Sequence, residues 1–298
     1  MQVTKPRWQG TRLAVVLRWL AVAGSAALLA AGCGASSDSG SQADQQAGSP
    51  NLGHVHGLGI NPADGQLYVA SHHGLFLVTE QDRPEQIAGL TQDFMGFTVA
   101  GPDHFLASGH PGPQDPDLPP HLGLTESTDA GQTWQSVSLS GEVDFHALEA
   151  AHGAVYGYDS QSGQIMVSTD QHTWDRRAAL SLADIAVSPA EPEIVLATTE
   201  QGPMQSTDGG NTFAPISDAP ILVFVDWLAA DRLLGVAPDG TVYASGDAGT
   251  SWTKQGTVSA SPQAILAHGE SDVYVATAEA IHRSSDNGKT FQVFQTLN

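Results

Sequence analysis

The chain has 298 residues, of which 32 are acidic and only 11 are Lys or Arg, so its formal net charge is −21. A chain this acidic repels nucleic acid and anionic lipid headgroups, which excludes both as partners of the folded part. Cys33 is the one cysteine in the sequence, so an intramolecular disulfide is excluded as well.

Residues 1–32 have the pattern of a secretory signal peptide. Basic residues precede an apolar run over residues 13–31, which Arg18 interrupts, and small residues come directly before Cys33. The segment resembles a bacterial lipoprotein signal, which implies that Cys33 is the lipidated first residue of the mature chain. The resemblance is incomplete, because Ala30 stands where that family prefers leucine. A plain transmembrane anchor is the alternative, although the run is short and charge-broken for a membrane span.

Residues 33–50 are rich in Ser, Gly, Gln and Ala and show no apolar periodicity, which predicts a flexible tether. Without the signal the chain keeps 7 Lys and Arg against 32 acidic residues, a formal charge of −25. This charge favours an extracellular setting and attracts cations. We therefore expect a secreted protein, anchored by lipid to the outer face of the cell membrane, whose folded domain covers residues 51–298.

A short motif recurs five times at nearly constant spacing. It reads STDAGQTW, STDQHTW, STDGGNTF, SGDAGTSW and SSDNGKTF. An aspartate in a tight turn accepts hydrogen bonds from nearby backbone N–H groups, and glycine supplies a positive φ. The second copy lacks one residue and the glycine, so its turn is expected to differ. The aspartates are 41, 38, 39 and 39 residues apart, at Asp129, Asp170, Asp208, Asp247 and Asp286.

The five copies resemble Asp boxes, the Ser-x-Asp-x-Gly-x-Thr-Trp motif of sialidase-type (BNR) β-propellers and of the related sortilin-like repeats. Asp boxes are structural in that family, so the resemblance places no chemistry on them. Units of about forty residues with four short strands are propeller blades. A Pro-rich insertion at residues 111–121 predicts a rigid loop in the second blade. We expect an all-β fold, a six-bladed β-propeller, with blades at residues 51–90, 91–139, 142–179, 180–217, 219–256 and 259–297.

Each blade is expected to begin with an inner strand beside the central channel. Aligning the inner strands of the first three blades puts histidines and carboxylates in register. His54 matches Asp93 and Asp144. His56 matches Met95 and His146. Because residues two apart on a strand share a face, both members of each pair point to the same side.

Further histidines follow the second strands of blades 1 and 2. In a propeller, the loop after a second strand shares a face with the loop that enters the inner strand, and the Asp boxes lie on the opposite face. His72 and His73 alternate in direction, so at most one of them points inward, and His73 is taken as that residue. We expect these donors to converge at one mouth of the channel: His54, His56, His73, Met95, His110 and His146.

Imidazoles together with a thioether and carboxylates suit a transition metal. Histidine with methionine favours copper, whereas imidazole alone suits zinc, copper or nickel. The mouth is therefore predicted to bind copper before zinc. Structural packing is the open alternative, because the rings could hydrogen-bond to one another and to water in a wet channel, and Met95 could fill the core.

A glycoside hydrolase is the main rival. The HVHGL and HHGLF segments resemble a lipoprotein subgroup of bacterial sialidase-like proteins that are often labelled exo-sialidase or glycosyl hydrolase by fold. A glycosidase needs two carboxylates across a cleft, which Asp93 and Asp144 could supply. Both could equally accept hydrogen bonds from histidines. A true sialidase is disfavoured, because no arginine lies on an inner strand to clamp a substrate carboxylate.

A protein-binding scaffold is the third interpretation. Asp-box propellers also serve as assembly factors and receptors, such as the photosystem II assembly factor type, and that resemblance implies a protein partner bound through one face. Whichever ligand the mouth binds, the loop at residues 111–121 is expected to form a lid or a partner-docking edge over it. We expect the protein to be a monomer.

Overall fold

Strands dominate the structure, a computed structural model that describes residues 52–297. The expected signal, the lipidation site Cys33 and the tether lie outside the described residues. The part that is described contains no α-helix, and one 3-10 turn, η1 (Ile87–Gly89), links the first two blades. No helix in residues 52–297 is long and apolar enough to cross a membrane.

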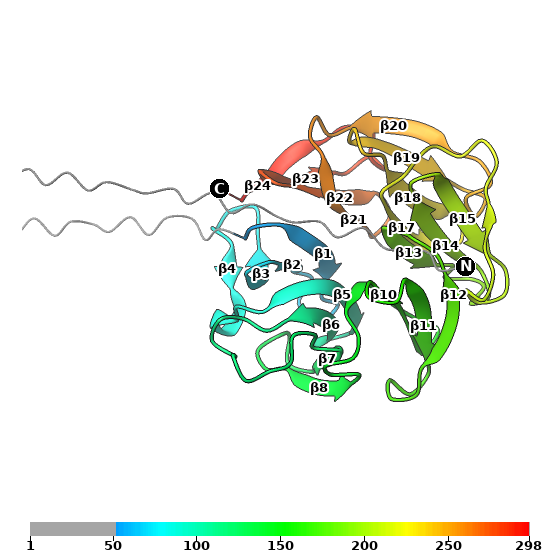
Figure 1. Cartoon of the computed structure of the whole chain (residues 1–298). Coiled ribbons are helices and arrows are strands. Elements are labelled where there is room, and N and C mark those ends of the chain that lie inside the picture. The colour runs from blue at the N-terminus through cyan, green and yellow to red at the C-terminus, as the bar shows by residue number, and fades with distance from the viewer. Residues whose placement is uncertain (1–51, 298) are drawn as a thin grey trace, which may run out of the picture. The chain divides into compact units, whose positions relative to one another are not determined.

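Six antiparallel sheets follow one another along the chain, each made of four consecutive strands (Figure 1). Blade 1 contains β1 (Val55–Ile60), β2 (Leu67–Ser71), β3 (Gly74–Val78) and β4 (Glu85–Gln86). Blade 2 contains β5 (Asp93–Gly101), β6 (His104–His110), β7 (Leu124–Ser127) and β8 (Gln135–Ser138). Blade 3 contains β9 (Phe145–Ala151), β10 (Ala154–Asp159), β11 (Gln164–Ser168) and β12 (Asp175–Ala179).

The remaining three blades repeat this order. Blade 4 contains β13 (Asp184–Val187), β14 (Val195–Thr199), β15 (Gly202–Ser206) and β16 (Ala214–Pro215). Blade 5 contains β17 (Phe224–Ala229), β18 (Arg232–Val236), β19 (Thr241–Ser245) and β20 (Thr253–Thr257). Blade 6 contains β21 (Pro262–His268), β22 (Asp272–Thr277), β23 (Ala280–Ser284) and β24 (Gln292–Thr296). The expected six-bladed β-propeller is confirmed.

The burial of each strand follows its place in the blade. Every residue of the second strands β2, β10 and β14 is buried, because neighbouring blades cover both faces of these strands. The outermost strands are short or polar, and β4 and β16 have only two residues each. Short polar edge strands discourage pairing with other chains.

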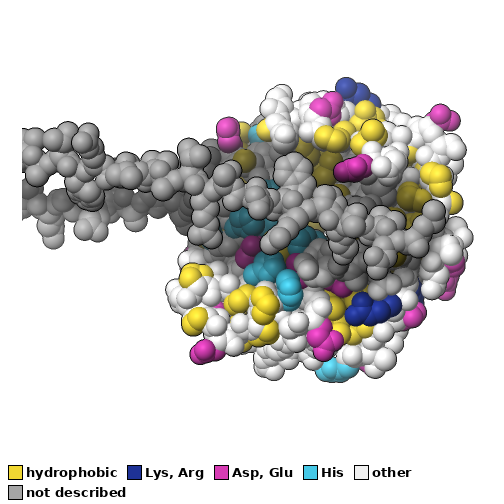
Figure 2. Space-filling model, viewed as in Figure 1, with side chains coloured by type: hydrophobic (Ala, Val, Ile, Leu, Met, Phe, Trp, Pro, Cys, Tyr) yellow, Lys and Arg dark blue, Asp and Glu magenta, His cyan; other side chains and the backbone are white. Residues whose placement is uncertain are grey.

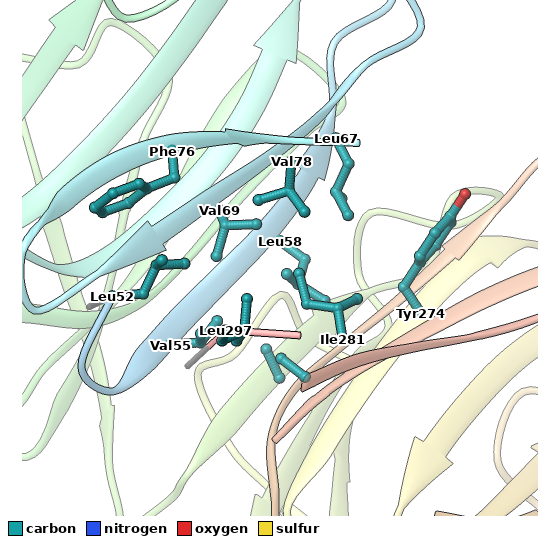
Figure 3. Packing of buried hydrophobic residues seen from close by; sticks show 12 residues of the cluster. Leu52, Val55, Leu58, Leu67, Val69, Phe76, Val78, Tyr274, Ile281 and Leu297 are labelled. Atoms are coloured by element: carbon teal, nitrogen blue, oxygen red, sulfur yellow. The ribbon is translucent and has the colours of Figure 1, made fainter. Parts of the chain in front are cut away.

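The inner strands β1, β5, β9, β13, β17 and β21 contact one another in turn, and β21 contacts β1, which closes the ring. Blades 6 and 1 share one hydrophobic cluster, in which Leu297 and Ile281 pack with Val55 and Leu58 (Figure 3). The backbone N–H of Val55 also donates to the side-chain oxygen of Gln263, at 2.9 Å. Since each described blade holds its own four strands, this closure uses side-chain packing and no exchanged strand.

The five repeated Ser-x-Asp turns join the third and fourth strands of blades 2 to 6. In the turn at Asp208, the hydroxyl of Ser206 donates to the carboxylate and accepts the N–H of Gly210 at 2.8 Å. Thr212 donates both its N–H and its hydroxyl to the same carboxylate. These bonds hold the pKa of Asp208 at about 2. The same bonds recur at Asp129, Asp247 and Asp286.

The turn at Asp170 differs, as its shorter sequence predicts. Its carboxylate accepts N–H bonds from His172 and Thr173. Gln171 keeps the positive φ of the other turns, at 62° against 57° to 70° for the equivalent residues. In blade 2, the N–H of Ala130 donates to the carbonyl of Asp103 in the turn between the first and second strands. The repeated turns therefore lie at the end of the ring opposite the loops that follow the second strands.

Candidate metal centre

A β-bulge recurs near the start of three neighbouring inner strands and positions the candidate donors. The register shifts between Val55 and Gly57 in blade 1, which leaves His56 unpaired. The equivalent shifts leave Met95 unpaired in blade 2 and His146 unpaired in blade 3. A bulge re-aims the side chain of its extra residue. The structure thus places His56, Met95 and His146 at equivalent points of consecutive blades, in the register that the sequence indicates.

The loops after the second strands meet the starts of the inner strands. The N–H of His72 donates to the carbonyl of His54 at 3.0 Å, and the N–H of Ser160 donates to the carbonyl of Asp144 at 2.9 Å. We call this end of the channel the mouth. Figure 2 shows histidine side chains gathered beside acidic ones on this face of the ring.

Three donor atoms from blades 1 and 2 meet at one point, and we call this group the first triad. The Nε2 atom of His56 lies 3.0 Å from Nδ1 of His72. The same Nδ1 atom lies 2.9 Å from Oδ1 of Asp93, and Nε2 of His56 lies 3.4 Å from that oxygen. In the tautomers that leave Nε2 of His56 and Nδ1 of His72 without a proton, the lone pairs of three donor atoms lie within 3.4 Å of one another.

His54 and His73, two of the expected donors, lie near this triad but are not part of it. The ring of His54 is 4.7 Å from the ring of His56 and 6.0 Å from that of His72, measured between centroids. Loss of solvation and then the two neighbouring rings lower the pKa of His54. The structure brings His72, rather than the expected His73, into the triad. His73 is exposed, and its ring centroid is 6.4 Å from that of His72.

A second group of donors, the second triad, comes from blades 2 and 3 and consists of His110, Asp144 and His146. Its donor atoms lie within 4.8 Å of one another. The Oδ2 atom of Asp144 is 2.9 Å from Nε2 of His146 and 3.8 Å from Nε2 of His110. Asp144 is only 2% exposed, whereas both histidines are partly accessible. A carboxylate beside two imidazoles is a set of ligand types that could hold a metal ion.

The carboxylates that a glycosidase would use are held by histidines. Burial alone would raise the pKa of Asp144, but hydrogen bonds from His146 and Ser160 outweigh it and hold the pKa at about 2. For Asp93, hydrogen bonds from His56 and His72 likewise outweigh burial and lower the pKa. Neither group carries a proton near neutral pH, so this pair lacks the general acid of a glycosidase.

Below the mouth, the channel encloses a cavity of about 300 Å³ that all six inner strands line. Glu149, Asp184 and Asp226 face it. Burial raises the pKa of Asp184 to about 7 and that of Asp226 to about 6, despite hydrogen bonds from backbone N–H groups. Asp184 accepts the N–H of Val225 at 3.0 Å, so it also ties blade 4 to blade 5.

Comparison with known proteins shows the fold and no closer kinship. No family model matches the chain, and no curated protein matches it. It is similar to YCF48 bound to D1 peptide, with a TM-score of 0.53, 15% identity and coverage of 82% of both chains. YCF48 from Cyanidioschyzon merolae gives a TM-score of 0.56 at 10% identity, over 81% of this chain and 98% of that one.

A GH74 xyloglucanase from Xanthomonas campestris is also similar, with a TM-score of 0.54 at 16% identity. The match covers 82% of this chain but only 38% of the xyloglucanase, so the chain spans well under half the length of that enzyme. At such identities the likeness shows the β-propeller fold alone. Membership of the sialidase-type repeat family stays a prediction.

Proposed function

We propose that this protein binds a transition-metal ion at the mouth of its channel, copper before zinc. The single observation that carries the proposal is the triangle formed by Nε2 of His56, Nδ1 of His72 and Oδ1 of Asp93, with sides of 3.0, 2.9 and 3.4 Å. An ion about 1 Å above this triangle would lie about 2.1 Å from all three atoms, which is the bond length of zinc with imidazole and carboxylate ligands.

The donor types support copper or zinc over a hard cation. Imidazole suits both metals, and the thioether of Met95 would favour Cu(I). Met95 stands in the blade between those of His56 and His146, which is the blade that supplies one donor to each triad. Magnesium and calcium require oxygen donors, which are the minority at this site.

The proposed setting is extracytoplasmic. A lipid on Cys33 would anchor the chain at the outer face of the cell membrane, with residues 33–50 as a flexible tether between the lipid and the propeller. The negative charge of the mature chain would raise the local concentration of cations near the site. A metal-handling lipoprotein is the function that this combination supports best.

Titration of the full chain, produced without a polyhistidine tag, with Cu(I), Cu(II) and Zn(II) tests the proposal. A variant with both His56 and His146 changed to alanine should lose tight binding, whereas the exposed His172→Ala control should keep it. Affinity weaker than about 10 μM, or affinity that the double variant retains, contradicts a metal function.

Peptide binding is the second candidate. The observation that favours it is the likeness to YCF48 bound to D1 peptide, which extends over 82% of each chain. The partner would dock at the mouth, against the loop at residues 111–121. Crosslinking at introduced residues on this loop, compared with residues on the opposite end of the ring, would locate such a partner.

Glycoside hydrolysis by Asp93 and Asp144 is the weakest of the three proposals, because both carboxylates have lowered pKa values. A panel of glycan substrates tests it directly. Hydrolysis that Asp144→Asn abolishes would restore it.

A further inference from the structure

His121 lies at the end of the insertion and beside the second triad. Its Nδ1 atom is 3.9 Å from Oδ2 of Asp144, and its ring centroid is 5.5 Å from that of His110. This Nδ1 atom is buried and has no hydrogen-bond partner. A buried ring nitrogen without a partner costs free energy, unless another group occupies the space that it faces.

The carboxylate of Asp144 has the same deficiency. Its Oδ2 atom accepts from His146 and from the hydroxyl of Ser160, at 2.9 and 3.0 Å. Its Oδ1 atom is buried and unpartnered. Two residues that meet at the second triad, one from the insertion and one from the channel wall, therefore each carry a buried polar atom without a partner. A cation would satisfy both, whereas a hydrophobic filler would satisfy neither.

The insertion also fixes the orientation of His110. The Nδ1 atom of His110 lies 2.7 Å from the carbonyl oxygen of Pro120. A carbonyl only accepts, so this ring nitrogen carries the proton in the neutral imidazole, and Nε2 keeps its lone pair. Nε2 is the atom that faces Asp144. Histidines that bind metal ions commonly donate their other N–H to a backbone carbonyl in this way.

We propose that His121 is the fourth ligand of the second triad, so that three imidazoles and one carboxylate bind one Zn(II) or Cu(II) ion; this rests on the proposed metal function. Donors about 2.1 Å from a tetrahedral ion lie about 3.4 Å apart. The distances from Oδ2 of Asp144 to the ring nitrogens of His146, His110 and His121 are 2.9, 3.8 and 3.9 Å, which bracket that separation.

The backbone around His121 is already held in place. Its carbonyl accepts the N–H of Gly141 at 2.8 Å, and the N–H of Leu122 donates to the carbonyl of Gly109 at 2.8 Å. Within the insertion, Asp115 accepts from the side chain of Gln92 at 2.7 Å. Ion binding requires the His121 ring to turn toward the triad, because the donor atoms that lie within 4.8 Å of one another do not include His121. The backbone can stay in place while the ring turns, and the bound ion would fasten the insertion to the mouth.

The test uses the full chain carrying His56→Ala, which isolates the second site. Adding His121→Ala should lower the affinity for Zn(II) and Cu(II) by about 10- to 100-fold. The Cu(II) electron paramagnetic resonance spectrum should lose one coupled nitrogen. Bound metal should also protect residues 111–121 from proteolysis in the chain with His121, and this protection should disappear in the variant. His172→Ala serves as the matched histidine control.

The outcomes separate the two proposals. If the unmodified chain binds neither metal, the proposed function fails together with this inference. If metal binds and His146→Ala removes it, but His121→Ala leaves the affinity and the number of coupled nitrogens unchanged, only the role of His121 is wrong. His121→Gln, which keeps a polar side chain of similar length, replaces the alanine variant if that variant melts at a lower temperature without metal.

Discussion

Asp93 and His110 are directly paired residues of β5 and β6, although Asp93 belongs to the first triad and His110 to the second. One strand pair therefore supplies a ligand candidate to each site. Gly109, next to His110, pairs with Phe94, next to Asp93. A displacement of this strand pair would move donors of both triads together, so we expect the two candidate sites to be mechanically linked.

Removal of individual histidines should separate the two sites. His56→Ala should abolish binding at the first triad and leave one ion at the second, and His146→Ala should do the reverse. The double variant should bind neither ion tightly, because the first triad would keep two donors and the second site would lose His146, the imidazole nearest to Asp144. Metal content after equilibrium dialysis measures this stoichiometry. Loss of both ions in either single variant would show instead that the mouth forms one shared centre.

The repeated sequence features predicted the architecture because they are local. Each Ser-x-Asp turn is built from residues within four positions of one another, so its spacing reports the blade period directly. The register of the inner strands could also be predicted from the sequence, because His56, Met95 and His146 occupy the equivalent bulge position of three consecutive blades. The spacing of the motif, rather than the composition of the chain, therefore predicted the blades and their alignment.

His72 and His121 were not predicted as donors, because their positions depend on turn geometry and on contacts between residues far apart in the sequence. The choice between His72 and His73 is made in a two-residue turn that ends at Gly74, with a φ of 112°. The alternation rule for strands does not apply there, and the bond between the N–H of His72 and His54 decides the outcome. His121 is brought to Asp144 by the path of the insertion, for which a single sequence offers no spacing rule.

The buried hydroxyl of each repeated turn should contribute to stability. Ser206→Ala should lower the free energy of unfolding by about 1–3 kcal/mol, because the N–H of Gly210 would be left buried without a partner. Ser168→Ala is the matched control, since the turn at Asp170 lacks the glycine. Urea denaturation of both variants measures the difference. Equal losses would mean that this N–H finds water as a substitute.

The channel carboxylates should make stability depend on pH. The pKa of Asp184 is about 7 in the folded chain against 3.8 as its ordinary value, so the folded state binds the extra proton between these limits. Stability therefore falls as the pH rises from about 4 to about 7. The stability of the Asp184→Asn variant should fall less steeply with pH than that of the unmodified chain. The exposed Asp231→Asn variant is the control, and its stability should fall as steeply as that of the unmodified chain. Chemical denaturation at half-unit pH intervals tests this, and an unchanged slope in Asp184→Asn would contradict it.

Gly109 provides a test of the linkage between the two triads. Its φ is 147°, and a Cβ atom there would lie 1.9 Å from the carbonyl oxygen of Asp93. Gly109→Ala must therefore push β5 away from β6 and displace Asp93 and His110 together. We expect it to weaken metal binding at both sites, although it removes no ligand.

Gly101→Ala, on the paired strand β5, is the matched control for this change. A Cβ atom at Gly101 would meet only the Cβ of His104, at 3.9 Å, which is ordinary van der Waals contact. Metal titration of the two alanine variants, each in the His56→Ala and the His146→Ala background, measures each site separately. Coupling through the strand pair must change the metal affinity of both sites. If Gly109→Ala weakens one site and leaves the other at the affinity of the Gly101→Ala control, the strand pair does not couple the triads.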